Sequence, residues 1–557
     1  MAKRLTDYVN KTYGSDIQIE KVDISSLSKI KLVHVLIRDH HGDSLIYVEN
    51  AKTSVSHLPS IFKNKFILGL TSLENGFLNM KTYKDEETNN LTVFSRLFDD
   101  GKETEGNKFI LTSPKIKLEN ISYELFDENK DEAPIVYYYG ITGDLNEFAI
   151  NGSEVKTQIR SISIDRNHLL KILDFNSDFK YTDTQMEFWH TNLTSENSFI
   201  DTDIVMNYGE DDLSDFNERV KINAFFKKSS IALVDLNHIY EEFGTKDIIY
   251  FTSQFVGTIN DFLVNDLDLR TERKSVLKGD FVFQDILDTE QFYIDGNIEK
   301  ISSSYSNLSI LLPRLLGKNL PESFKDVGTF EASGNFALTK NTLNLNMDSN
   351  SGLGKVSTDL YLTDYQIIDK AKYKGTVAME DFKLGTYLKN PHVGRLSLQG
   401  KFDGQGFSLN SINTSIIGNI SKHEYKGYTY RNIDVNGVFR NRNFQGELAV
   451  DDPNLKMIFS GLADLSKKIY LFDFEANVEY IDLKPLHLFE KYEKSIVKGK
   501  VNIKLTGNTI ENLDGEISFQ DASFSNENDD YFFKDFHVLA EMQGYRENNF
   551  HQFTGHY

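Results

Sequence analysis

The sequence of 557 residues contains no cysteine, only eight prolines and a single tryptophan. The absence of cysteine excludes disulfides, thiolate zinc sites and cysteine nucleophiles, and it leaves oxidising and reducing compartments equally open. Basic residues are also few, because 61 lysines and arginines stand against 83 acids, for a net charge of −22. Nucleic acid requires a basic patch rather than a diffuse acidic surface. We therefore predict no nucleic-acid partner.

Long apolar runs are missing as well. The longest, at 308–316, is interrupted by a proline and an arginine, and it falls far short of the about 20 residues that cross a bilayer. The opening Met1-Ala-Lys-Arg is not followed by the apolar core of a signal peptide. Leu5 and Val9 instead stand at helical spacing ahead of Gly14, which predicts one short amphipathic helix at the start.

Aromatic residues are abundant, with 41 phenylalanines and 27 tyrosines, and such residues suit half-buried strands. Apolar and polar residues alternate at 343–347 and at 472–480. Each such strand has one apolar and one polar face, which is typical of antiparallel sheets with one solvated side. At 116–125 the alternation contains one extra residue, which predicts a β-bulge. Asp403-Gly404, Asn436-Gly437 and Asp514-Gly515 predict turns between strands.

A repeat is visible at five junctions, where a strand-like run ends at an Asp or Asn before a short apolar segment. The intervals are 70, 72, 74 and 101 residues, as expected of an array of similar units. An Asp or Asn side chain can accept a hydrogen bond from the first turn of a helix. The predicted helix caps are Asp165, Asp235, Asn307, Asp381 and Asp482. The alternative is an ordinary large β-protein with scattered caps.

Together these patterns predict a mostly β protein, built as a repetitive antiparallel sheet with short helices at about 70-residue intervals. They leave open whether the apolar faces pair in a sandwich or line an open groove. The expected divisions are an N-terminal unit at 1–130, which contains the amphipathic helix, and two stretches of further repeats at 131–327 and 328–557.

Several stretches also show a family likeness. They are Val22-Asp-Ile-Ser-Ser, Val35-Leu-Ile-Arg-Asp, Leu312-Pro-Arg-Leu-Leu-Gly, Gly328-Thr-Phe-Glu-Ala-Ser-Gly, Phe382-Lys-Leu-Gly, Gly394-Arg-Leu-Ser-Leu-Gln-Gly and Tyr428-Thr-Tyr-Arg-Asn-Ile. With these the chain resembles the AsmA-like/TamB family (translocation and assembly module inner-membrane subunit) in its Bacteroidetes form. The resemblance spans nearly the whole sequence, although each motif is degenerate.

The resemblance implies an elongated β-taco with an apolar groove that carries phospholipids across the periplasm of a Gram-negative bacterium, between the inner and outer membranes. It also implies an alternative, a scaffold that assembles outer-membrane proteins together with an Omp85-type barrel partner. The family's N-terminal inner-membrane anchor and C-terminal β-rich domain have no counterpart here. We therefore expect an N-terminal and central fragment of such a protein.

Acyl chains of phospholipids are the expected ligands, held by the apolar positions of the alternating strands. A closed hydrophobic core is the alternative for each of these positions. The predicted groove residues are Leu343, Leu345, Met347, Leu360, Leu362, Phe472, Phe474, Val478, Val501, Ile503, Leu505, Ile517 and Phe519.

Catalytic and metal motifs are not recognisable. No histidine pair stands at metal-ligand spacing, and no phosphate loop or nucleophile elbow occurs. The adjacent His40 and His41 lie in a turn between Asp39 and Asp43, which is compatible with a weak metal site but favours a solvated turn. We therefore predict no enzyme activity, no cofactor and no metal. A secreted adhesin or glycan-binding solenoid is a further alternative, but it would require exposed aromatic ladders and a signal peptide.

Overall fold

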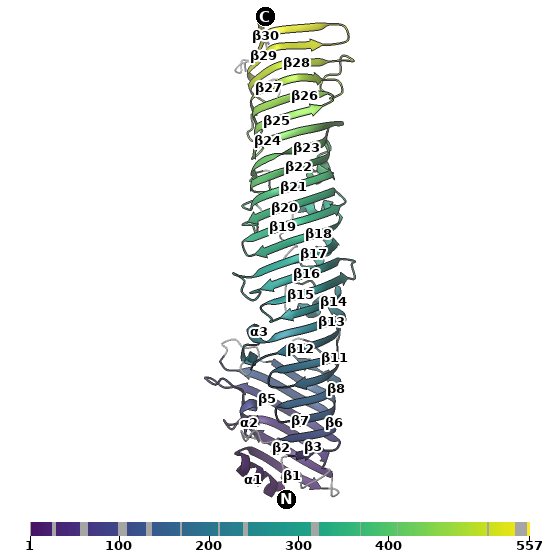
Figure 1. Cartoon of the computed structure of the whole chain (residues 1–557), viewed down its shortest axis with the longest axis vertical. Helices are drawn as coiled ribbons and strands as arrows, with labels where there is room; N and C mark the ends of the chain where they lie inside the picture. Colours follow the sequence, from purple (N-terminus) through teal and green to yellow (C-terminus); the bar gives the residue numbers. More distant parts are fainter. Residues whose placement is uncertain are drawn as a thin grey trace, which may run out of the picture. The chain divides into compact units, whose positions relative to one another are not determined.

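A computed structural model describes residues 2–24, 29–55, 65–97, 109–129, 136–167, 170–209, 212–237, 243–313, 322–367, 369–408, 410–508, 512–540 and 554–556. The chain forms two compact units. Figure 1 shows their strands and helices, coloured along the sequence. Unit 1 comprises residues 1–287 with 307–319, and unit 2 comprises residues 288–306 with 320–557. The division expected after residues 130 and 327 stays a prediction.

Unit 1 begins with the predicted amphipathic helix, α1 (Ala2–Tyr13), which ends at Gly14 with a φ of +68°. Seven strands follow, and β1, β2, β3 and β5 pair antiparallel in that order. β6 then pairs parallel with β4 and β5 and antiparallel with β7. A parallel pair needs a long connection, and the one from β5 to β6 contains α2 (Asn90–Arg96). The strands are β1 (Asp16–Ile24), β2 (Lys29–Arg38), β3 (Ser44–Ser54), β4 (Lys65–Ile67), β5 (Thr71–Thr82), β6 (Ile110–Asp127) and β7 (Val136–Asn151).

The rest of unit 1 is an antiparallel meander whose register shifts at several points, where bulges bend the strands. β7 pairs with β8 and β9, β8 pairs with β10, and each later strand pairs with the next. The strands are β8 (Glu154–Ile164), β9 (Arg166–Asn167), β10 (Ile172–Tyr181), β11 (Gln185–Ser195), β12 (Phe199–Asn207), β13 (Lys221–Ala232), β14 (Ile248–Gly257), β15 (Phe262–Thr271) and β16 (Val276–Gln284). The short helices are η2 (Asp212–Asp215), α3 (Phe216–Arg219) and α4 (Leu233–Leu236).

Unit 2 is an antiparallel meander from β17 to β31, in which each strand pairs with its successor in the chain. Its strands are β17 (Tyr293–Ser304), β18 (Thr329–Thr339), β19 (Thr342–Ser351), β20 (Gly354–Thr363), β21 (Lys372–Phe382), β22 (Val393–Gln405), β23 (Asn413–Tyr425), β24 (Tyr428–Arg440), β25 (Asn443–Asp452), β26 (Leu455–Asp464), β27 (Leu471–Asp482), β28 (Ile496–Thr506), β29 (Asp514–Ser525), β30 (Asp530–Ala540) and β31 (Thr554–His556). Its helices include η3 (Glu322–Val327) and α6 (Leu384–Leu388), while α5 (Tyr305–Leu311) starts directly after β17.

The sheet is open in the part of the chain that the structure describes, since β1 pairs only with β2 and β31 only with β30. The predicted fold class is confirmed: the protein is mostly β, and its sheet is repetitive, largely antiparallel and not closed on itself. Short helices recur at the predicted interval, because α4, α5 and α6 begin at residues 233, 305 and 384.

The predicted helix caps are wrong, although short helices lie near three of them, Asp235, Asn307 and Asp381. Asp235 and Asn307 lie inside α4 and α5, and the N-cap of α4 is Ala232. Asp381 lies in β21 with a φ of +49°, and Lys383 is the N-cap of α6. Asp165 precedes the two-residue strand β9, and Asp482 ends β27 ahead of a series of turns.

Asp235 is the clearest case, because its carboxylate is 5% exposed and serves a distant turn. The hydroxyls of Ser195 and Ser198 donate to its Oδ2 at 2.9 and 2.6 Å, and the amide of Asn197 donates to Oδ1 at 3.1 Å. These three donors belong to the turn between β11 and β12. The side chain therefore fastens that turn to the end of β13.

Replacing this carboxylate should destabilise unit 1. We expect Asp235→Ala to cost about 2–4 kcal/mol in the free energy of unfolding, because two buried serine hydroxyls and the amide of Asn197 lose their acceptor. Asp235→Asn should cost less, since the amide oxygen still accepts. Urea unfolding, combined with hydrogen exchange in the β11–β12 turn, would measure both. Equal stability of the alanine variant and the native chain would contradict this role.

Candidate functional site

The candidate site is one face of the unit 2 sheet, which we call the apolar face. Directly paired residues of neighbouring antiparallel strands project to the same side of a sheet. The pairings of β17 to β30 join into one uninterrupted row on this face. The row consists of Gly296, Phe336, Leu345, Leu360, Gly375, Phe402, Ile416, Gly437, Gly446, Gly461, Phe474, Ile503, Ile517 and Val538.

The structure places all thirteen predicted groove residues on the apolar face. Leu345, Leu360, Phe474, Ile503 and Ile517 belong to the row above. A second row, on one side of it, contains Leu343, Leu362, Phe472 and Leu505. A third, on the other side, contains Met347, Val501 and Phe519, and Val478 stands one row further out. Sequence alternation therefore identified the face correctly, while the use of the face as a lipid groove stays a prediction.

The polar face carries the charges. The residues next to the central row, on the other side of the sheet, are Asn335, Asn346, Asp359, Thr376, Lys401, Ile417, Asn436, Glu447, Ser460, Glu475, Asn502, Ser518 and His537. Ion pairs join adjacent strands there, as between Lys355 and Glu380 at 2.9 Å and between Lys456 and Glu479 at 3.3 Å. The sheet is therefore strongly two-sided.

A histidine does reach the apolar face. His423 is paired with Leu396 and Tyr430 on this side of the sheet, and its Nδ1 is buried without a hydrogen-bond partner among the described residues. Burial lowers the pKa of His423 because it penalises the imidazolium form. The ring is consequently neutral at neutral pH, and the face stays uncharged there. Sequence alternation did not find this residue.

The apolar face is half-buried rather than sealed. Except for Gly296, which is buried, every residue of the central row keeps part of its surface exposed. The most enclosed aliphatic side chains of unit 2 lie in the turns at strand ends, such as Leu353 at 2% exposure and Leu486 at 3%, although Ala476, Val478 and Leu505 on the apolar face are also buried, at 5–8%. A closed core would enclose the central row as well, whereas most of that row is only partly buried. The burial pattern therefore favours an accessible face with packed rims.

The strands of unit 1 also carry a row of mostly apolar residues on one face. From β8 to β16 a row of paired residues reads Thr157, Phe179, Phe188, Ile204, Ala224, Phe255, Val264 and Phe281. The parallel row next to it includes stacked rings, with Phe262 centred 4.7 Å from Phe255 and 4.5 Å from Phe283. A small sealed core around Val220 and Ile222 lies at one end of these strands. Both rows lack charged residues.

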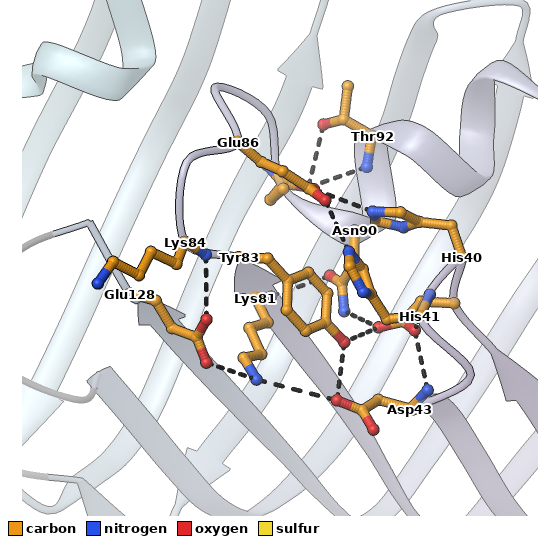
Figure 2. A network of polar contacts seen from close by, with 12 residues as sticks. His40, His41, Asp43, Lys81, Tyr83, Lys84, Glu86, Asn90, Thr92 and Glu128 are labelled. Carbon is orange, nitrogen blue, oxygen red and sulfur yellow. Dashed lines mark hydrogen bonds and ion pairs between the residues drawn. The ribbon is translucent and has the colours of Figure 1, made fainter.

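A separate polar network in unit 1 connects the β2–β3 turn to the segment after β5 (Figure 2). Asp39, 7% exposed, accepts from the amide of Asn90 at 2.8 Å and from the hydroxyl of Tyr83 at 2.7 Å. Burial alone would raise the pKa of Asp39, but these hydrogen bonds, with two from backbone N–H groups, outweigh it and lower the pKa. Burial and the neighbouring carboxylates raise the pKa of Tyr83. Asp39 is therefore ionised and tightly held at neutral pH.

Comparisons with known proteins add no assignment. No family model matches the chain, and neither the curated proteins nor the solved structures contain a match. Among the described residues, no helix combines the length and apolarity needed to cross a bilayer. Inferences about function consequently rest on the apolar face, on the polar network and on the family resemblance.

Proposed function

We propose that the apolar face binds the acyl chains of phospholipids and that the chain is a segment of a lipid-transfer bridge. The observation that carries this proposal is the row of paired residues from β17 to β30, which contains no charged or strongly polar side chain. Neighbouring rows preserve this character across the width of the face. An apolar strip on this scale, left half-exposed, indicates a surface made for a ligand.

The physical basis is the transfer of hydrocarbon from water. Each methylene of an acyl chain gains roughly 0.8 kcal/mol when it is buried. The central row offers a headgroup no charges or hydrogen-bond donors, so the headgroup would stay in water beyond the packed rims. Strands succeed one another about every 4.8 Å, so equivalent positions repeat at short intervals. A lipid moving along such a row would exchange one apolar contact for an equal one, without a deep energy minimum.

The resemblance to the AsmA-like/TamB family implies a cellular location for this lipid binding. On that basis we place the protein in the periplasm of a Gram-negative bacterium, between the inner and outer membranes, and we assign it no catalytic activity. The two-sided strands and the short helices at regular intervals are compatible with that family. These two features support the proposed family assignment only through their architecture.

Native mass spectrometry of the whole chain, secreted into a bacterial periplasm with an added signal peptide, would test the proposal. We expect several phospholipids per chain, which organic extraction removes and identifies. A lipid-free, monodisperse protein would contradict lipid binding. It would favour a closed core and turn attention to the scaffold function in outer-membrane protein assembly.

A further inference from the structure

Two histidine side chains converge on one carboxylate beside the polar network of unit 1 (Figure 2). Nε2 of His40 lies 2.9 Å from Oε2 of Glu86, and Nε2 of His41 lies 2.6 Å from Oε1 of the same residue. One ligand atom from each of the three residues can be chosen so that all lie within 4.8 Å of one another. The histidines come from the β2–β3 turn, and Glu86 comes from a segment 45 residues later. The sequence analysis therefore identified only the histidine half of this cluster.

Hydrogen bonds hold in place the two chain segments that carry His40, His41 and Glu86. Oδ1 of Asp39 accepts from the backbone N–H groups of His41 and Asp43 at 3.0 and 2.9 Å, which fixes the turn that carries both histidines. Oδ2 of Asp39 binds Tyr83 and Asn90, which fixes the segment on either side of Glu86. The ring of His41 also packs on Tyr83, with centroids 3.9 Å apart. The ligand atoms are thus positioned before any ion arrives, as a binding site requires.

The donor set selects a class of ion. Two imidazole nitrogens and one carboxylate suit Zn²⁺ and neighbouring transition metals, whereas Mg²⁺ and Ca²⁺ prefer oxygen ligands alone. Bond lengths near 2.0–2.2 Å place tetrahedral ligand atoms roughly 3.3 Å apart. Small side-chain rotations would bring the three atoms to that spacing. The nearby carboxylate of Asp39 adds negative charge that favours a dication, whereas the charge of Asp43 is offset by Lys81 at 3.8 Å.

We propose that His40, His41 and Glu86 form a Zn²⁺ site, with water at the fourth position. The side chains of these residues are 29%, 46% and 30% exposed, so an ion can enter from solvent. Bound zinc would cross-link the β2–β3 turn to the segment between β5 and α2, two parts of the chain that now meet through hydrogen bonds. This site is independent of lipid binding on the apolar face.

Isothermal titration of the EDTA-treated full chain with ZnCl₂ tests the proposal. We expect one Zn²⁺ per chain, with affinity reduced at least 10-fold in His41→Ala and in Glu86→Ala. His190→Ala is the matched control, because the His190 side chain also contacts a single carboxylate, Asp178 at 3.0 Å, but no second histidine joins them among the described residues. The control should bind zinc like the native chain. Failure to bind zinc, or binding unchanged in both site variants, would overturn the proposal.

A second measurement needs no variant and remains valid if the variants misfold. Co²⁺ in a tetrahedral site gives strong visible absorption, whereas hydrated Co²⁺ absorbs weakly. We expect the native chain to develop this absorption at one equivalent and to lose it when Zn²⁺ is added. Weak absorption that grows without saturation would show adventitious binding to surface histidines and would overturn the proposal.

Discussion

Leu345→Asp is expected to reduce the phospholipid bound per chain at least tenfold while leaving the fold intact. Leu345 lies in the central row of the apolar face, between Phe336 on β18 and Leu360 on β20. A carboxylate there must lose its water when an acyl chain covers it, and that cost exceeds the gain from several methylenes. Without lipid the half-buried position keeps the carboxylate hydrated, so β19 should still form. Native mass spectrometry would measure the lipid, and circular dichroism the fold.

The matched control is Asn346→Asp, which introduces the same charge one residue later in the same strand. Asn346 is exposed on the polar face, so lipid occupancy should not change. A second pair with the opposite charge, Phe474→Arg against Asn477→Arg on β27, extends the comparison. If Leu345→Asp and Phe474→Arg unfold the protein, these residues belong to a closed core. Unchanged lipid occupancy in the same two variants would show that lipid binds elsewhere.

Strand identity was predictable because it is a local property. The alternation at 472–480 corresponds to β27, and the extra residue at 116–125 appears as a register shift between Leu118 and Ile121. Side chains in a strand point alternately to opposite faces, so a two-residue period also divides the residues between faces. This is why all thirteen groove residues fall on one side. Their one-sidedness required no knowledge of which strand pairs with which.

The remaining features depend on contacts that no local pattern encodes. Asp235 resembles a helix cap in sequence, yet its carboxylate accepts hydrogen bonds from two serines of the β11–β12 turn, which lie about 40 residues earlier in the chain. Glu86 stands in a polar segment and gains its role only because that segment folds against His40 and His41. In each case a side chain that usually interacts with its sequence neighbours instead contacts residues far away in the sequence.

The three turns predicted from glycine-containing pairs are wrong. Asp403-Gly404 and Asn436-Gly437 were predicted to be turns, but they lie within β22 and β24, and Asp514-Gly515 begins β29. Their glycines belong to the apolar face, where Gly437 is followed in the central row by Gly446 and Gly461. The turn rule uses the freedom of glycine at a chain reversal. Here the absence of a side chain matters instead, because a Cβ atom at Gly404, Gly437 or Gly515 would lie within 2.7 Å of a carbonyl oxygen of the paired strand.

Gly461→Val should therefore be among the most damaging single changes in unit 2. Gly461 has a φ of +146°, and a Cβ atom there would lie 2.5 Å from the carbonyl oxygen of Asp473 and 2.5 Å from Cα of Phe474. Backbone strain and overpacking together should cost about 3 kcal/mol. Because an array of strands unfolds in parts, the loss should appear as faster hydrogen exchange in β26 and β27, with distant strands unaffected.

Ser460→Val provides the control, since Ser460 is the preceding residue of β26 and is exposed on the polar face. Valine suits an exposed strand position, so exchange in β26 and β27 should stay as in the native chain. If both variants behave alike, the close pairing of Gly461 with Phe474 is wrong, and with it the register of the central row. If only Gly461→Val loosens these strands, the row is fixed by backbone contact. Acyl chains are proposed to lie on that same row, so both Gly461→Val and Leu345→Asp should bind less lipid. In Gly461→Val the cause would be disorder of the strands, and in Leu345→Asp it would be the introduced charge alone.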